Sequence, residues 1–209
     1  MIRAVVFDCD GVLVDSEPIS NRVLAVLLTE AGMPISPEGA VEAFMGRSWK
    51  NVLAWADERG GLPEGFRRRY LDAMFAAFEA ELRPVPGIAE ALDAIALPNC
   101  VASSASLEKM RFTLGHTGLW QRFDGRIFSA TEVEHGKPAP DLFLHAAASM
   151  GWDPAGCAVV EDAPAGVEAG RRAGMTVFGY AGRTPAEQLG GAHRVFGDMA
   201  ELPGLLQPS

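Results

Sequence analysis

The stretch AVVFDCDGV, at residues 4–12, joins the pattern of a buried strand to a pair of carboxylates. The apolar run that ends at Phe7 is followed at once by Asp8 and Asp10, with Gly11 next. A buried strand that ends on two carboxylates needs a functional reason, because burying an unpaired charge is costly. Residues two apart on an extended segment project to the same side, so both carboxylates can face one ligand. The stretch therefore predicts a polar site at the end of the first strand.

The composition limits the class of protein. The chain has 209 residues, 48% of them hydrophobic, and a formal net charge of −9. That charge disfavours nucleic acid and anionic membranes as partners, and no apolar stretch approaches the roughly 18 to 20 residues that span a bilayer. The three cysteines, Cys9, Cys100 and Cys157, show no clustered spacing and predict no zinc site. We expect a cytoplasmic protein that is a monomer or a weak homo-oligomer, with neither nucleic acid nor membrane as partner.

Helical periodicity fills the chain from Ser16 to about Leu82. Apolar residues recur at helical spacing in four segments that Gly and Pro residues separate. The predicted helices cover residues 18–32, 36–46, 48–60 and the segment that begins at Pro63.

Strand and helix patterns alternate after the proline-containing connector RPVPG at 83–87. Besides the first strand at 2–7, the predicted strands are 100–103, 125–130, 157–162, 175–180 and 194–197, with helices at 107–114, 141–150 and 164–173. This alternation predicts an α/β fold with a Rossmann-like, mostly parallel sheet.

The helical block interrupts this sheet, because one strand precedes it and the others follow it. We therefore predict a core domain of residues 1–15 and 83–209 with an inserted four-helix cap domain of residues 16–82. Ligands of open α/β sheets bind at the carboxyl ends of the strands, so the cap is expected to cover the site as a lid. The tail LPGLLQPS, at 202–209, is predicted to be frayed.

Polar residues follow the other strands of the predicted sheet as well. Ser103 and Ser104 end one strand, Glu161 and Asp162 end another, and Lys137 lies in a loop ahead of a helix. Carboxylates at this density need a cation, and hard oxygen ligands suit Mg²⁺, which also accepts a substrate phosphate oxygen. A lysine and a serine are then suited to hold the remaining phosphate oxygens.

Four motifs in one order carry a resemblance to a known family. FDCDGV at 7–12, VASS at 101–104, GKPAPD at 136–141 and VVEDAPAG at 159–166 resemble the motifs of the haloacid dehalogenase superfamily. The helical insertion looks like the C1 cap of its β-phosphoglucomutase-like branch. Within that branch the chain is similar to bacterial phosphatases of 6-phosphogluconate and other sugar phosphates. The resemblance covers almost the whole chain and implies a phosphoric monoester hydrolase.

The resemblance implies a role for each carboxylate. Asp8 is the nucleophile that forms an aspartyl-phosphate, and Asp10 is the general acid and then the base that activates water. The Mg²⁺ ligands are the Asp8 side chain, the Asp10 backbone carbonyl and Asp162, with Glu161 as a further ligand or as a partner of one.

The remaining motif residues are implied to bind phosphate. Ser103 and Lys137 hold the transferring phosphoryl group, and Ser104 is the weaker candidate. The expected substrate is a small phosphate ester that fits beneath a lid.

Three alternatives stay open beside a phosphatase. Asp10 argues against a dehalogenase, which lacks this second aspartate. A mutase of the β-phosphoglucomutase type carries a histidine where this chain has Ser20, so hydrolysis is favoured over transfer. Arg47, in FMGRSW at 44–49, is either a cap residue that pairs with an anionic substrate group or a solvated turn arginine. The alternative of another class is a non-catalytic protein that binds a phosphorylated metabolite.

Overall fold

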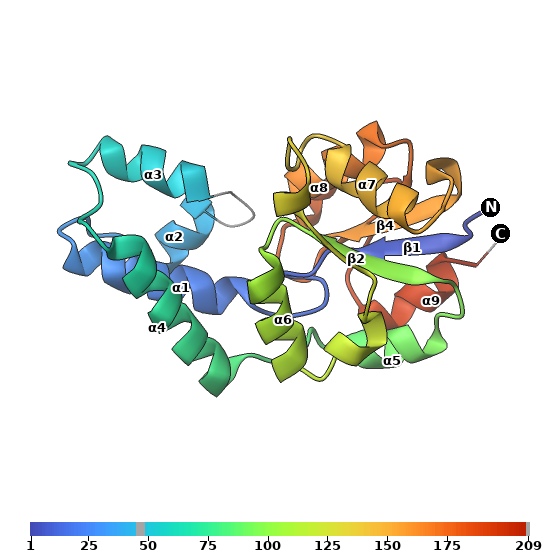
Figure 1. The fold of residues 1–209 in the computed structure, drawn as a ribbon, viewed down its shortest axis with the longest axis horizontal. Coiled ribbons are helices and arrows are strands. Elements are labelled where there is room, and N and C mark those ends of the chain that lie inside the picture. Colours follow the sequence, from blue (N-terminus) through green and yellow to red (C-terminus); the bar gives the residue numbers. More distant parts are fainter. Residues whose placement is uncertain (45–48, 208–209) are drawn as a thin grey trace. The chain divides into compact units, whose positions relative to one another are not determined.

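The computed structural model describes residues 1–44 and 49–207. These residues form two compact units, one of Met1–Val14 with Pro84–Ser209 and one of Asp15–Arg83. The first is the α/β unit and the second the helical unit, and Figure 1 shows the elements of both. Arg47 lies outside the described residues.

The α/β unit is built on a six-stranded sheet with the order β3-β2-β1-β4-β5-β6. The strands are β1 (Ala4–Phe7), β2 (Asn99–Ser103), β3 (Ile127–Ser129), β4 (Cys157–Glu161), β5 (Thr176–Tyr180) and β6 (Arg194–Phe196). Every pairing between these strands is parallel, which confirms the predicted Rossmann-like sheet. The strand order reverses at β1, which lies between β2 and β4, and such a switch point is where α/β sheets bind ligands.

Both faces of this sheet are covered, which explains why β1 is apolar throughout. Ala4 and Val6 belong to a core cluster with residues of α7 and α8, and Val5 and Phe7 are fully buried as well. Successive side chains of a strand point to opposite faces, so a strand buried on both sides must be a continuous apolar run. Figure 1 shows α7 and α8 on one face of the sheet and α5, α6 and α9 on the other.

The helices of the α/β unit are α5 (Ile88–Ala94), α6 (Leu107–His116), α7 (Asp141–Ser149), α8 (Pro164–Arg172) and α9 (Leu202–Leu205). The sequence patterns did not predict two of them, α5 and α9. The short α5 follows Gly87, whose φ of 77° starts the turn, and it buries Ile88 and Leu92. The prediction of a frayed tail at 202–209 was wrong for residues 202–206, because α9 buries Leu202 and the chain continues to a buried Leu206. Residues 208–209 lie outside the described residues.

The helical unit contains α1 (Glu17–Glu30), α2 (Pro37–Phe44), α3 (Trp49–Asp57) and α4 (Phe66–Glu81). Ser36 caps α2 as its position before Pro37 predicts, since its hydroxyl accepts a hydrogen bond from the Gly39 N–H at 3.0 Å. The unit has its own apolar cluster, in which Leu28 and Ala56 are completely buried. Its role as a cap stays a prediction.

No helix of residues 1–44 and 49–207 combines the length and the apolar character that crossing a membrane requires.

Candidate active site

The loop after β1 is held tightly against the sheet. The Asp8 N–H donates to the Val160 carbonyl of β4 at 3.0 Å, so Asp8 continues the strand pairing by one residue. The chain then turns back at Gly11, whose φ is +81° and whose N–H bonds the Val14 carbonyl at 2.8 Å. Glycine adopts this backbone region without steric cost. Asp8 and Asp10 are thereby fixed at the carboxyl edge of the sheet, as predicted.

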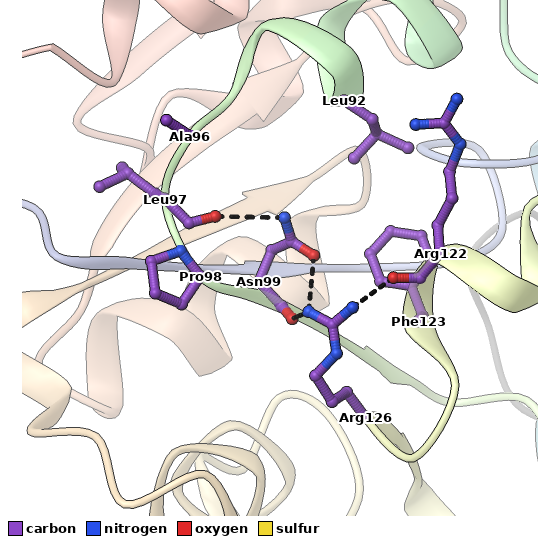
Figure 2. A pocket seen from close by; sticks show the side chains of 8 residues that line it. All are labelled: Leu92, Ala96, Leu97, Pro98, Asn99, Arg122, Phe123 and Arg126. Atoms are coloured by element: carbon purple, nitrogen blue, oxygen red, sulfur yellow. Dashed lines mark hydrogen bonds between the residues drawn. The ribbon is translucent and has the colours of Figure 1, made fainter.

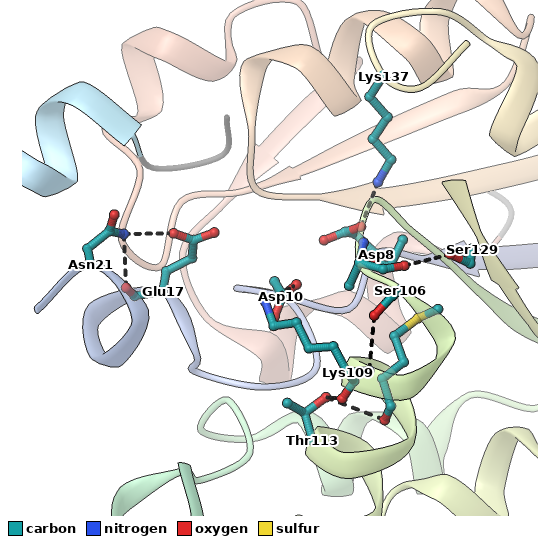
Figure 3. A network of polar contacts seen from close by, with 12 residues as sticks. Asp8, Asp10, Glu17, Asn21, Ser106, Lys109, Thr113, Ser129 and Lys137 are labelled. Atoms are coloured by element: carbon teal, nitrogen blue, oxygen red, sulfur yellow. Dashed lines mark hydrogen bonds and ion pairs between the residues drawn. The ribbon is translucent and has the colours of Figure 1, made fainter. Parts of the chain in front are cut away.

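Lys137 connects Asp8 to Glu161. Its ammonium lies 2.6 Å from Asp8 Oδ1, 2.7 Å from Glu161 Oε1 and 3.2 Å from the Ala102 carbonyl oxygen. All three charged side chains are at least nine-tenths buried. The ring of Phe143 lies 4.7 Å from the same ammonium and adds a cation–π contact. The structure thus brings together residues of all four motifs around one buried cation, and Figure 3 shows its ion pair with Asp8.

The charges of this cluster depend on one another. Burial raises the pKa of Asp8 to about 7, which the Lys137 ammonium opposes and the Glu161 carboxylate reinforces. Burial alone would lower the pKa of Lys137, but the carboxylates of Asp8 and Glu161 outweigh it and raise that pKa. Lys137 therefore stays a cation, whereas burial makes the Asp8 carboxylate easier to protonate than an ordinary aspartate. A further positive charge beside Asp8 would hold it fully ionised.

Both carboxylate oxygens of Glu161 accept hydrogen bonds from within the protein. Oε1 accepts from Lys137, and Oε2 accepts from the Ala163 N–H at 2.7 Å, just before α8 begins at Pro164. The carboxylate also lies directly against Gly166, where a Cβ atom would come within 1.7 Å of Oε1. Glu161 therefore orients Lys137 and the start of α8.

The Asp162 carboxylate lies against the loop that follows β1. It packs against Gly11 so closely that a Cβ there would lie 2.0 Å from Oδ2. In the described part of the chain no three His, Cys, Asp or Glu side chains form a metal-binding group. A Mg²⁺ ion that keeps several waters needs fewer side chains than that. The carboxylates of Asp8 and Asp162, with the Asp10 carbonyl, are a donor set that fits such an ion.

The second motif lies at the end of β2. Ser103 is buried, and its hydroxyl accepts a hydrogen bond from the Ala105 N–H at 3.2 Å, while Ser104 is exposed. Ser129, at the end of β3, donates to the Ala105 carbonyl at 2.7 Å and so holds the loop that follows Ser103. Sequence reasoning gave Ser129 no role, although its place at the carboxyl end of a strand was available as a signal.

Lys109 is the second residue that sequence reasoning missed. Its ammonium bonds Asp10 Oδ2 at 2.9 Å, from the first turn of α6 (Figure 3). The available signals were its place six residues after Ser103 and the need for cations around an acidic site in a chain of net charge −9.

The predicted cap residue Ser20 belongs to α1 of the helical unit. Its hydroxyl is buried and has no hydrogen-bond partner among the described residues. The next residue, Asn21, is also buried, and its side-chain amide donates to the carbonyl and the carboxylate of Glu17, each at 2.9 Å.

A hollow of about 340 Å³ lies elsewhere in the α/β unit. It is lined by Leu92, Ala96, Leu97, Pro98, Asn99, Arg122, Phe123 and Arg126 (Figure 2). These residues surround the amino end of β2, opposite the end that carries Ser103. The Arg126 guanidinium already donates to the Asn99 carbonyl and side chain and to the Arg122 carbonyl. We therefore place the candidate active site at the polar cluster and not in this hollow.

Comparisons with known proteins identify the family of the chain. Residues 2–174 match the sequence model of the haloacid dehalogenase-like hydrolases. The 6-phosphogluconate phosphatase of Escherichia coli is 33% identical over 180 residues, which are 85% of this chain and 81% of that protein. A haloacid dehalogenase-like protein of unknown function from Agrobacterium tumefaciens superposes with a TM-score of 0.88 at 36% identity, over 99% of this chain and 98% of the other. A family hydrolase from Deinococcus radiodurans, with bound phosphate and sodium, gives a TM-score of 0.81 at 31% identity, over 100% and 99%.

Proposed function

Since the chain belongs to the haloacid dehalogenase-like hydrolase family and is a phosphoric monoester hydrolase, we propose that it is a Mg²⁺-dependent phosphatase of a small sugar phosphate that works through an aspartyl-phosphate on Asp8. One observation carries the proposal: the buried bridge from Asp8 through Lys137 to Glu161. The bridge holds a carboxylate nucleophile beside a permanent cation at the switch point of a parallel sheet.

The first half of the reaction transfers the phosphoryl group to Asp8. A carboxylate oxygen of Asp8 attacks phosphorus, the ester P–O bond breaks, and Asp10 gives its proton to the leaving oxygen. Lys137 stabilises the charge that develops on the phosphoryl oxygens, because its ammonium is already fixed beside Asp8. Ser103 supplies a hydroxyl for another of these oxygens.

The second half releases inorganic phosphate. Asp10 is now ionised and takes a proton from water as the water oxygen attacks phosphorus. The bond between phosphorus and the Asp8 oxygen breaks, and both carboxylates return to their starting states. Glu161 keeps Lys137 in place throughout, because both of its own oxygens stay bonded within the protein.

Asp8, the Asp10 carbonyl and Asp162 would hold the Mg²⁺ ion, which shields the phosphate charge from the attacking carboxylate. Glu161, predicted as a ligand or as a partner of one, takes the second role in this assignment. Its bonds to Lys137 and to the Ala163 N–H support that choice.

The substrate class rests on relatives and on the predicted cap. Curated relatives of this chain include a 6-phosphogluconate phosphatase and a phosphorylated carbohydrates phosphatase, the latter 30% identical over 184 residues. We propose that the helical unit acts as the cap that the sequence predicts, and that the substrate is a small phosphate ester. Ser20, which stands where mutases carry a histidine, supports hydrolysis over phosphoryl transfer.

Phosphate release from a panel of sugar phosphates, including 6-phosphogluconate, tests the proposal with Mg²⁺ and with chelator. Asp8→Asn is the blank, because it keeps the shape of the side chain and loses the nucleophile. Metal-dependent release that disappears in the variant is the expected result. Conversion of β-glucose 1-phosphate to glucose 6-phosphate without release of phosphate would instead establish a mutase. No turnover by a folded protein that binds Mg²⁺ would establish a non-catalytic binding protein.

A further inference from the structure

We infer that Lys109 is a positioning residue for Asp10, and that it selects which carboxylate oxygen of Asp10 faces the leaving group. The inference rests on the proposed function, since it assigns atoms within that reaction. It is carried by the bond of 2.9 Å between Lys109 Nζ and Asp10 Oδ2.

The backbone of Lys109 is fixed before its side chain reaches the site. Ser106 is the N-cap of α6, and its hydroxyl accepts from the Lys109 N–H at 3.3 Å. The Lys109 carbonyl accepts from the Thr113 hydroxyl at 3.0 Å, one turn further along. Side chains in the first turn of a helix point back toward its amino end, which here leads to the carboxyl edge of the sheet. The helix therefore presents the ammonium to the loop after β1 (Figure 3).

The pair is sheltered enough to hold its geometry. The side chains of Lys109 and Asp10 are 22% and 16% exposed, whereas most other ion pairs of the described residues join side chains more than one-third exposed. A partly buried pair is screened less by salt than an exposed one. Lys137 thus forms an ion pair with Asp8, and Lys109 forms one with Asp10.

This contact gives the two oxygens of Asp10 different tasks. A protonated carboxyl group accepts hydrogen bonds through its carbonyl oxygen and donates through its hydroxyl oxygen. While Oδ2 accepts from Lys109, Oδ1 is the oxygen that carries the proton to the leaving group. As the ester bond breaks, the proton passes from Oδ1 to the leaving oxygen and the ionised carboxylate stays bonded to Lys109. Without the ammonium, the carboxyl group rotates and the proton is presented less often in the right direction.

Two substrates that differ in their need for a proton test this inference. The alkoxide of 6-phosphogluconate or another sugar phosphate needs a proton to leave, whereas the phenolate of p-nitrophenyl phosphate leaves without one. The measured quantity is kcat/KM, because it covers only the steps up to cleavage of the ester bond. General acid catalysis contributes about 100- to 10,000-fold, so we expect Lys109→Met to lower kcat/KM for the sugar phosphate about 10- to 100-fold. The same variant should lower kcat/KM for p-nitrophenyl phosphate less than about 3-fold, because that step needs no acid.

Matched variants make the outcome specific. Lys109→Arg keeps a cation at the same place and should restore most of the activity on the sugar phosphate. Arg122→Met removes a different ion pair of the same unit, the one between Arg122 and Asp93 at 2.6 Å. This variant should leave kcat/KM unchanged for both substrates. Thermal unfolding of each variant separates loss of fold from loss of orientation.

Equal losses on the two substrates, or no loss on either, would overturn the role of Lys109. Failure of the proposed function looks different, because the unmodified protein would then release phosphate from neither substrate.

Discussion

Gly166→Ala places a methyl group where the Glu161 carboxylate lies. In an ordinary helix this change is favourable, since alanine in place of glycine stabilises a helix interior by about 0.5–1 kcal/mol. Here the added Cβ would lie 1.7 Å from Oε1, 1.9 Å from Cδ and 2.5 Å from Oε2 of Glu161. The whole carboxylate must therefore move, and its bonds to Lys137 and to the Ala163 N–H are lost or distorted.

The magnitude follows from those two bonds. Hydrogen bonds to charged groups contribute about 1.5–3 kcal/mol each, so the loss of both exceeds the gain in helix propensity. We expect the free energy of unfolding to fall by about 2–5 kcal/mol, as measured by denaturant titration. Displacement of Lys137 should also lower kcat, because a misplacement of about 1 Å at a reacting group can reduce the rate about 100-fold.

Gly115→Ala is the matched control, since Gly115 lies in α6 and has no atom within 4 Å of the added methyl group. That variant should be as stable as the unmodified protein or up to about 1 kcal/mol more stable. In a Glu161→Ala background the steric conflict is gone, so adding Gly166→Ala should no longer destabilise the protein. A Gly166→Ala protein of unchanged stability and full activity would refute the reasoning.

Two further predictions concern the proposed Mg²⁺ site. Gly11→Ala combines a φ of +81° with a Cβ only 2.0 Å from Asp162 Oδ2, so titration calorimetry should show Mg²⁺ affinity reduced at least about 10-fold. Gly118→Ala is the control, because it has similar backbone strain at φ +74° but no neighbour within 4 Å of the added Cβ, and it should bind Mg²⁺ normally. Equal Mg²⁺ affinities in the two variants would contradict the assignment of Asp162 as a metal ligand. Because the pKa of Asp8 is raised to about 7 and only the ionised carboxylate binds the metal, Mg²⁺ affinity should rise as pH increases. The expected rise between pH 6 and pH 8 is about 10-fold, and an affinity that does not change over this range would contradict the combination of a raised Asp8 pKa with Asp8 as a ligand.

The sequence predicts the strands and the motif residues well because both follow from strong local patterns. A strand buried on both faces must be an apolar run, and polar residues at its carboxyl end are conspicuous, as Asp8 after Phe7 illustrates. Parallel strands bring their carboxyl ends to one edge of the sheet, so four separate motifs predict one site without any long-range information. The structure places Asp8, Lys137 and Glu161 within hydrogen-bond distance, as that argument requires.

The missed features depend on contacts between distant segments. Lys109 occupies the first turn of an ordinary helix, where a lysine is usually solvated, and only the fold brings it to Asp10. Ser129 is a common type of strand-end residue until its bond to the Ala105 carbonyl is known. The helix at Leu202–Leu205 escaped prediction because a Pro and a Gly interrupt its pattern, while burial of Leu202 and Leu206 against the rest of the unit stabilises it.

The central place of β1 also has a consequence for folding on the ribosome. The strand is among the first segments synthesised, yet Ala4 pairs with Cys157, about 150 residues later in the chain. At about 5–20 residues per second, β1 waits roughly 8–30 s for this partner. The helical unit, Asp15–Arg83, is complete in sequence long before β4 is synthesised and can form during that interval. We therefore expect synthesis to produce a folded helical unit first, with the apolar strand AVVF unpaired at one edge and open to chaperones until β4 emerges.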